Sequence, residues 1–183
     1  NGPSMASFSK TPPQKIAFCV TGLAPGGAEN NLVQLVERID RAKFRPSVTS
    51  ILPRPHRTVL LERLKKVGVE PRFLNYRHSR QYLAAVGSLT ASLRTLQPAL
   101  VHSFLFHANC VAASAARRAG QLPLVTGIRV AEPGRSWRQW WEQYATRDAV
   151  RCVCVSEDVR NHLAGRGVIP GKAVVIPCGV DLG

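Results

Sequence analysis

Short apolar runs alternate with segments of helical periodicity along the whole chain. Lys15 to Thr21 has the length and the β-branched and aromatic content of a buried strand, and Glu29 to Asp40 then repeats apolar residues at helical spacing. The same features predict further strands at Ser47–Leu52, Val69–Leu74, Ala99–Ser103, Leu122–Ile128, Val150–Val155 and Ala173–Ile176. Helices are predicted between them, one ending at a Gly68 cap and others at Tyr82–Leu96, Phe106–Arg118, from Ser136 onward and at Ser156–Ala164.

This repeated order of strand and helix predicts the fold class. Right-handed crossovers make successive strands run parallel and place helices on both faces of the sheet. The sequence therefore predicts a Rossmann-like, doubly wound α/β domain with a parallel sheet of about seven strands over residues 15–183. Ligands of such sheets bind outside the carboxyl ends of the strands, where the strand order reverses. Functional residues are therefore expected in the loops that follow the strands.

The length and composition fit one domain. The chain has 183 residues, of which 45% are hydrophobic, enough for a full core. Residues 1–14 are excluded from the domain, because Asn1 to Ser4 resemble a cloning remnant and the Pro- and Ser-rich remainder is typical of a disordered lead-in. No run approaches the ~18 apolar residues that cross a bilayer, and the N-terminus lacks the apolar core of a signal peptide. We therefore expect a cytoplasmic protein whose five cysteines, which lack C-x-x-C spacing, are reduced core residues rather than metal ligands.

The loop after the first predicted strand carries two adjacent glycines, Gly26 and Gly27, followed by Glu29 and Asn30. Glycines let a ligand approach the backbone closely, and amides at a helix N-terminus bind anions, so this loop is a candidate cradle for a phosphate or a sugar. It matches neither the dinucleotide fingerprint nor the P-loop. The alternative is a tight turn in which Glu29 only complements the helix dipole.

The loop after the fourth predicted strand reads V-H-S-F-L-F-H-A-N and is expected to face the glycine loop. It offers His107 and Asn109 as candidate substrate-binding groups, with His107 favoured because it lies at the start of a helix. His102 is expected to be structural.

The formal net charge of +14 is concentrated partly in the remaining loops. Six arginines and one acid follow the second, third and fifth predicted strands: Arg54, Arg57, Arg77, Arg80, Arg129, Arg135 and Glu132. The arginines of this rim are expected to contact a phosphorylated ligand or an anionic membrane, and the alternative is a solvated basic face. Arg129 and Glu132 are also candidate substrate-binding residues.

A predicted helix carries Trp137, Trp140, Trp141 and Tyr144 among arginines. Spacings of three and four place these rings on one helix face, which favours core packing over base stacking. No RNA- or DNA-binding motif accompanies them, so no nucleic-acid partner is expected. Zinc spacings, a nucleophile elbow and a D-x-D motif are also missing from the sequence, so no metal site is predicted.

Five segments in series resemble a known family: G-G-A-E, V-H-S-F-L-F-H-A-N, G-I-R-V-A-E, V-C-V-S-E and V-I-P-C-G-V-D. Together they are similar to the N-terminal domain of retaining glycosyltransferase family 4, of the GT-B fold. The resemblance implies transfer of a sugar from a nucleotide-sugar donor to a sugar or lipid-linked acceptor, in cell-surface polysaccharide or glycolipid synthesis. It implies no metal or other cofactor. The arginine-rich loops add the expectation that this cytoplasmic protein lies on the inner face of the membrane.

The family also implies a second, donor-binding domain that lies beyond Gly183, so the isolated chain is expected to fold without transferring sugar. Many members have histidine where this chain has Arg129 and asparagine where it has Cys178. Arg129 cannot act as a base at neutral pH but can hold a phosphate, which fits front-face attack with the leaving phosphate as proton acceptor. The alternative function is a non-catalytic basic domain that binds nucleic acid or anionic lipid.

Overall fold

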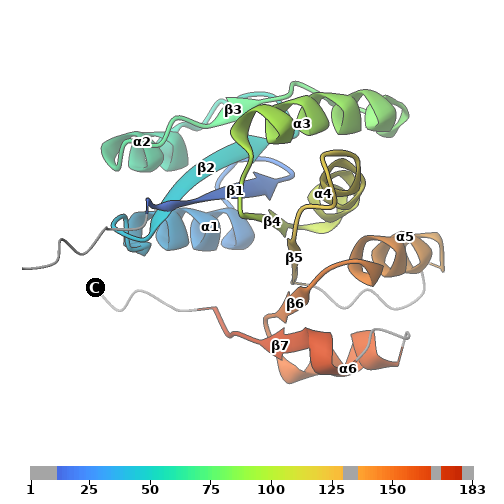
Figure 1. Cartoon of the computed structure of the whole chain (residues 1–183). Helices are drawn as coiled ribbons and strands as arrows, with labels where there is room; N and C mark the ends of the chain where they lie inside the picture. Colours follow the sequence, from blue (N-terminus) through green and yellow to red (C-terminus); the bar gives the residue numbers. More distant parts are fainter. Residues whose placement is uncertain (1–11, 130–135, 166–169, 179–183) are drawn as a thin grey trace, which may run out of the picture.

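A computed structural model describes residues 12–129, 136–165 and 170–178. Its centre is one parallel sheet in the order β3-β2-β1-β4-β5-β6-β7 (Figure 1). The strands are β1 (Gln14–Val20), β2 (Phe44–Ser50), β3 (Arg72–Phe73), β4 (Leu100–Phe104), β5 (Leu124–Ile128), β6 (Arg151–Cys154) and β7 (Ala173–Val175). The predicted doubly wound α/β fold with seven parallel strands is confirmed.

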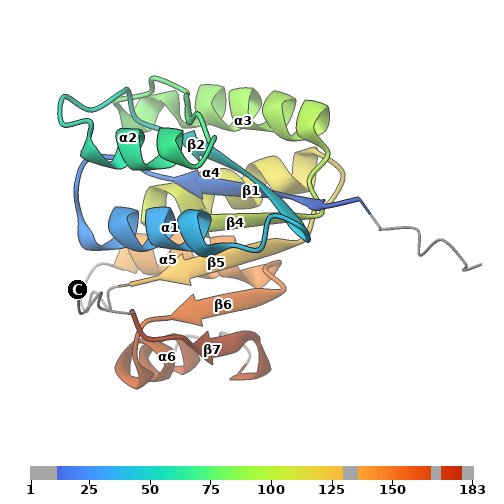
Figure 2. The ribbon, with the colours of Figure 1, turned by 90° about the vertical axis from the view of Figure 1, so that its left-hand side faces the viewer.

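Helices cover the sheet unequally on its two faces. They are α1 (Gly27–Arg38), α2 (Val59–Lys66), α3 (Tyr82–Leu96), α4 (Phe106–Arg118), α5 (Ser136–Arg147) and α6 (Glu157–Ala164), with 3₁₀ turns η1 (Ser79–Gln81) and η2 (Pro170–Lys172). Helices α1 and α2 lie on one face and α3, α4 and α5 on the other (Figure 1). In the described part of the chain, β5 and β6 have no helix in front of them on the α1 side (Figure 2).

The core is divided by the sheet into two clusters of buried side chains. Phe18, Val20 and Leu32 belong to the cluster under α1 and α2. The opposite cluster is built around α4, whose buried residues from Ala108 to Ala116 are mostly small. Small side chains let a helix approach the sheet and two neighbouring helices closely, and α4 indeed contacts both α3 and α5.

The predicted helix end at Gly68 is confirmed in detail. Gly68 has a φ of 72°, a conformation that glycine adopts without the steric cost of a Cβ atom. Its N–H donates to the Lys65 carbonyl, and the N–H of Val69 donates to the Leu64 carbonyl, both at 2.9 Å. These two bonds form a Schellman motif, and the buried side chains of Val69 and Leu64 supply its usual apolar contact.

Two strands differ most from the predicted boundaries, and the others are displaced by only one or two residues at an end. β2 starts three residues earlier than predicted and contains Pro46, which has no N–H for a ladder bond. The proline is tolerated because β3 pairs only with Thr49 and Ser50, so β2 has a single neighbour at Pro46. β3 itself is reduced to Arg72–Phe73, directly after Pro71.

Four of the five cysteines are buried and unpaired, as the sequence predicted, whereas Cys178 is exposed. Burial raises the pKa of Cys19 to about 12 and that of Cys154 to about 11, so both thiols stay protonated and unreactive at neutral pH. The expectation that all five are core residues is therefore wrong for Cys178, which follows the last strand. None of the helices in the described ranges combines the length and apolar content needed to cross a membrane.

Candidate functional site

The strand order reverses between β1 and β4, which lie side by side with Val20 opposite Phe104. The chain turns toward β2 after β1 and toward β5 after β4, so the two following loops open a crevice at the carboxyl edge. The Thr21 hydroxyl joins these loops by accepting the N–H of Ala108, in the first turn of α4, at 3.3 Å. The glycine loop and the start of α4 therefore lie at the same edge of the sheet.

The two glycines of the first loop have different surroundings. Gly26 is the extended N-cap residue of α1, and a Cβ atom there would collide with a carboxylate oxygen of Glu29. A Cβ at Gly27 would meet no described atom within 4 Å. The Glu29 carboxylate thus lies against the N-terminus of α1, where the helix dipole stabilises a negative charge. The same helix end that could bind a phosphate already has an anionic side chain beside it.

Asn30 has protein partners at both ends of its amide. Its Nδ2 donates to the Gly26 carbonyl at 3.0 Å, and its Oδ1 accepts from Arg63 Nη1 at 3.1 Å. Arg63 also donates to both carboxylate oxygens of Glu37, with Nε to Oε1 at 2.8 Å, and this hydrogen bonding lowers the pKa of Glu37. Asn30 therefore ties the glycine loop to α1 and α2, and we assign it a structural role.

Leu105, the residue between β4 and α4, has a φ of 72°. A leucine in this region is strained by about 1 to 3 kcal/mol, and such residues cluster at functional loops. The strained turn starts α4 at Phe106 and leaves the next residue, His107, exposed at the carboxyl edge. His107 also packs edge-on against the Phe106 ring, with centroids 5.2 Å apart.

Asn109 lies inside the domain, although the sequence suggested a ligand group. Its exposed fraction is 2%, its Oδ1 accepts from Ser103 Oγ at 2.7 Å, and its Nδ2 donates to the Gly127 carbonyl at 3.0 Å. These bonds fasten α4 to β4 and β5. The buried alanines and cysteine around Asn109 were a signal in the sequence that this helix face points inward.

His102 packs among aromatic rings on the α1 side of the sheet. Its centroid lies 5.7 Å from that of Phe18 and 4.4 Å from that of Phe104. Burial, with a further contribution from the charge of Arg129, lowers the pKa of His102 to about 4. The imidazole is therefore neutral at physiological pH, in keeping with the structural role expected for it.

Arg129 follows β5 and reaches across the carboxyl edge. Its Nη1 donates to the Cys178 sulfur at 2.7 Å, and its guanidinium carbon lies 5.7 Å from the centroid of Phe104. Arg129 and Cys178, the two positions at which the sequence departs from what the resemblance implies, are thus in direct contact. Glu132 and Arg135, which the sequence also placed in this loop, lie outside the described residues.

The predicted basic rim is only partly assembled. Arg54, Arg57 and Arg77 line a cavity of about 420 Å³ between the loops after β1 and β2, which we call the basic cavity. Arg80 lies in the exposed η1 turn, outside the lining of this cavity. Three arginines without an acidic residue in the described lining make the basic cavity suited to an anionic ligand.

A second cavity, of about 330 Å³, lies between α3, α4 and α5 beneath the loops after β2 and β3. Its lining includes five aromatic side chains, so we call it the aromatic cavity: Tyr76, Tyr82, Phe106, Trp137 and Trp141. His107 and Thr21 lie at its border with the switch point, and Arg77 lines both cavities.

The expectation that the aromatic helix face packs into the core is wrong for two of its tryptophans. Trp137 is 57% exposed and Trp140 is 59% exposed. Trp141 and Tyr144 are half-buried, and Trp141 packs edge-on against Tyr82 with centroids 5.3 Å apart. Helical spacing shows that side chains share a face, but it does not show whether that face meets a filled core or a cavity.

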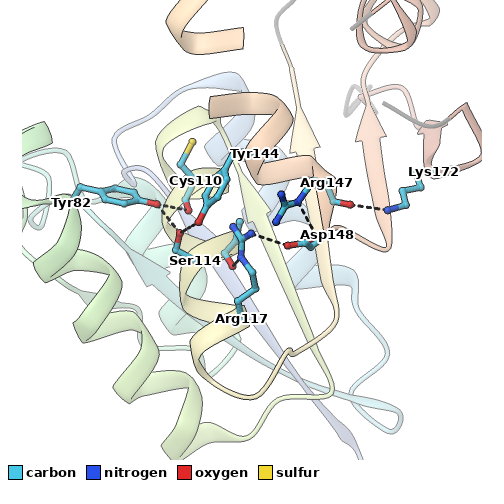
Figure 3. Close-up of polar contacts among 9 residues, drawn as sticks. Tyr82, Cys110, Ser114, Arg117, Tyr144, Arg147, Asp148 and Lys172 are labelled. Atoms are coloured by element: carbon cyan, nitrogen blue, oxygen red, sulfur yellow. Dashed lines mark hydrogen bonds and ion pairs between the residues drawn. The ribbon is translucent and has the colours of Figure 1, made fainter. Parts of the chain in front are cut away.

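Hydroxyl groups join α3, α4 and α5 behind the aromatic cavity (Figure 3). Tyr82 Oη lies 2.8 Å from Ser114 Oγ and donates to the Cys110 carbonyl at 3.1 Å, and Ser114 Oγ lies 3.2 Å from Tyr144 Oη. The Arg117 guanidinium covers the Tyr144 ring at 4.1 Å and donates to Asp148 at 2.8 Å. The aromatic wall is therefore held by polar contacts on its far side.

Residues 25–183 match the sequence pattern of Glycosyltransferase Family 4. The chain belongs to this glycosyltransferase family. The match begins inside the glycine loop, continues to the end of the chain, and bears out the resemblance carried by the five segments. No curated protein matches the chain by sequence.

Solved structures share the fold of this family 4 chain. HepE (Alr3699) from Anabaena, solved with UDP and glucose, superposes with a TM-score of 0.76 at 19% identity over 92% of the chain and 45% of its own length. A glycosyltransferase from Rickettsia africae gives 0.73 at 17% identity, over 92% of the chain and 44% of its own. The UDP-GlcNAc 2-epimerase of Neisseria meningitidis, bound to UDP-GlcNAc, superposes with a TM-score of 0.65 at 17% identity, over 88% of the chain and 45% of its own length.

These similarities carry different weight. At such identities the superpositions show the fold, which transferases and epimerases share, whereas the family match distinguishes between them. The chain spans about half the length of the structures it matches. Its seven-strand sheet is thus one Rossmann-like domain of the GT-B type.

Proposed function

We propose that this chain provides the acceptor side of a retaining glycosyltransferase, which moves a sugar from a nucleotide-sugar donor to an acceptor. The observation that carries the proposal is the meeting of two cavities and the glycine loop at the strand switch point. The acceptor belongs to cell-surface polysaccharide or glycolipid synthesis, and the enzyme works at the cytoplasmic face of the membrane. The exposed arginines of the loops are suited to attract an anionic membrane surface.

The donor is held mainly by a second domain that completes the enzyme. HepE was solved with UDP and glucose, which supports a nucleotide sugar as donor for a chain of the same fold and of family 4. Gly27, at which a Cβ atom would meet no described atom within 4 Å, lets the donor approach the backbone, and Arg129 contributes positive charge beside the transferred sugar. No metal or other cofactor is needed in this scheme.

Arg129 stabilises charge rather than moving a proton. A guanidinium stays protonated at neutral pH, so it cannot take the proton of the attacking hydroxyl. It can hold the departing phosphate, which then accepts that proton while the new glycosidic bond forms on the face that the phosphate leaves. This front-face course gives retention of configuration.

The test is a transfer assay with radiolabelled UDP-glucose and UDP-GlcNAc, lipid extracts as acceptors, and the protein joined to its second domain. Enzyme-dependent glycoside with the donor's anomeric configuration, assigned by NMR, is the expected product. In Arg129→Gln we expect kcat to fall about 100-fold, whereas Arg151→Gln, an exposed base on β6, should leave it unchanged.

Two results would count against the proposal. Hydrolysis or epimerisation of the donor without glycoside formation would place the chain with the epimerases of the same fold. Salt-dependent binding of any polyanion without sugar selectivity would instead favour a non-catalytic basic domain that binds nucleic acid or anionic lipid. Residues 1–183 alone should give no glycoside, because transfer requires both substrates to be held together.

A further inference from the structure

We propose that the aromatic cavity binds the hydrocarbon chain of a lipid phosphate, with its phosphate held at Arg77. The inference rests on the proposed function and names the class of acceptor that the enzyme takes. A cavity of about 330 Å³ lies within the range of specific small-molecule sites. It is large enough for part of a chain and too small for a whole lipid, so the remainder of the chain would extend past the exposed Trp137.

The two tyrosines of the cavity wall offer carbon rather than hydrogen-bonding groups. The hydroxyl of Tyr82 bonds to Ser114 and Cys110 on α4, and that of Tyr76 bonds to Ser88 on α3 at 2.9 Å. Both tyrosines therefore present ring carbon to a ligand. A sugar needs partners for its hydroxyls, because burying them unpaired costs several kcal/mol, whereas a hydrocarbon chain needs none.

Trp137 is the wall residue whose exposure a bound chain would change most. It is 57% exposed although it lines the cavity, and it packs edge-on against Phe106 with centroids 6.0 Å apart. Covering an exposed indole with hydrocarbon removes apolar surface from water on both partners, which is favourable. An open cavity with an exposed tryptophan on its wall therefore favours an apolar ligand.

Most polar groups of the lining gather at η1 and the loop before it, whereas Thr21 and His107 lie at the switch point. Arg77 and His78 come from the loop before η1, and Ser79 begins that turn. The Gln81 side chain fixes the loop by accepting the N–H groups of Arg77 at 2.9 Å and His78 at 3.1 Å. The Arg77 backbone is thus held while its side chain stays exposed between the two cavities. A guanidinium at this place suits a phosphate on a chain that enters the aromatic cavity.

The test is calorimetric titration of the purified protein with dodecyl phosphate, kept below its micelle concentration. Inorganic phosphate serves as the ligand with the anionic head group alone, and dodecyltrimethylammonium as the ligand with the same chain and a cationic head group. Trp137→Ala should weaken dodecyl phosphate binding about tenfold, because part of the apolar contact is lost. Trp140→Ala is its matched control, since Trp140 is equally exposed on the same helix but lies outside the cavity lining.

Arg77→Gln should also weaken the binding of dodecyl phosphate about tenfold, because it removes a charge-assisted hydrogen bond. Its control is Arg80→Gln, which removes the same charge three residues away from an exposed position outside the lining. Inorganic phosphate and the cationic amphiphile should each bind at least tenfold more weakly than dodecyl phosphate. All four variants alter exposed side chains, so their circular dichroism spectra should match that of the unchanged protein.

Equal weakening by Trp137→Ala and Trp140→Ala, or equally tight binding of the cationic amphiphile, would overturn the proposal. So would competition by UDP, because the cavity would then be a nucleobase site. Failure of the two proposals is distinguishable. Transfer to water-soluble acceptors without dodecyl phosphate binding would refute only the lipid site, and binding without any transfer would refute only the enzymatic proposal.

Discussion

The hydroxyls of Tyr82 and Ser114 lie 2.8 Å apart, and this contact decides which side of Tyr82 meets the aromatic cavity. Burial raises the pKa of Tyr82, so the phenol stays protonated and remains a donor. Because its polar end is engaged on α4, the ring serves the cavity as an apolar surface.

The first prediction follows from that contact. Tyr82→Phe should lower the free energy of unfolding by about 1 kcal/mol, the net value of a hydrogen bond, and should leave dodecyl phosphate binding unchanged. Urea denaturation and calorimetry measure the two quantities. If binding falls as far as it does in Trp137→Ala, the hydroxyl faces the ligand and the wall is not apolar there.

Asn109 should be a stability residue. Asn109→Ala removes partners from the Ser103 hydroxyl and the Gly127 carbonyl inside the domain, and should lower the free energy of unfolding by about 2 to 3 kcal/mol. Asn161→Ala, on the exposed surface of α6, should change it by no more than about 0.5 kcal/mol. If Asn109→Ala lowers the free energy of unfolding as little as Asn161→Ala does, and also weakens substrate binding, Asn109 has the ligand role that the sequence suggested.

Acid should destabilise the protein through His102. Its folded pKa is about 4, below the ordinary value of 6.5, so the unfolded chain binds the extra proton more readily. The part of the free energy of unfolding that depends on neutral His102 is therefore fully present above about pH 6.5. It is lost as the pH falls toward 4, by about 3 kcal/mol. Urea midpoints at a series of pH values measure this loss.

The matched variant is His102→Phe, whose ring fits between Phe18 and Phe104. Between pH 6.5 and about 4.5 its midpoint should stay flat. At lower pH both proteins should lose further stability, because the pKa of Glu37 is lowered by Arg63 and protonation breaks that pair. If the urea midpoint of His102→Phe still falls with pH above about pH 4.5, the loss of stability belongs to another titrating group.

Binding to anionic membranes should depend on the loop arginines. Arg77→Glu combined with Arg80→Glu reverses two exposed charges, and each basic residue near an anionic surface contributes about 1 kcal/mol. The affinity for phosphatidylserine vesicles, measured by co-sedimentation, should therefore fall at least tenfold. Neutral vesicles and high salt provide the controls, and unchanged co-sedimentation would show that these loops are not the contact.

The fold could be predicted from the sequence because it depends on local patterns. Periodicity gave α3 and α4 with the same boundaries that the structure has, and Gly68 marked a helix end through its own backbone preference. The boundaries that were misplaced most are those set by neighbouring elements. β3 is limited to two residues after Pro71, and the early start of β2 depends on its pairing with β1.

The site was less predictable because its side chains are engaged by distant partners. Asn109 bonds to Gly127, 18 residues away, and Asn30 bonds to Arg63, 33 residues away. Loop position alone suggested that both amides face a ligand. The aromatic cavity was missed for the same reason, since Tyr76 and Trp137 meet only when α3, α4 and α5 have packed.

The two outer strands are short, and this limits the pairing of the sheet edges with a strand of a second molecule. An open sheet exposes unpaired backbone groups along its rim, and a long rim is a template on which another chain can add a strand. Here β3 has two residues and β7 has three, against seven in β1. Neither outer strand is long enough to seed a stack of sheets, so crowded copies of this molecule are protected from growing into fibrils through their backbones.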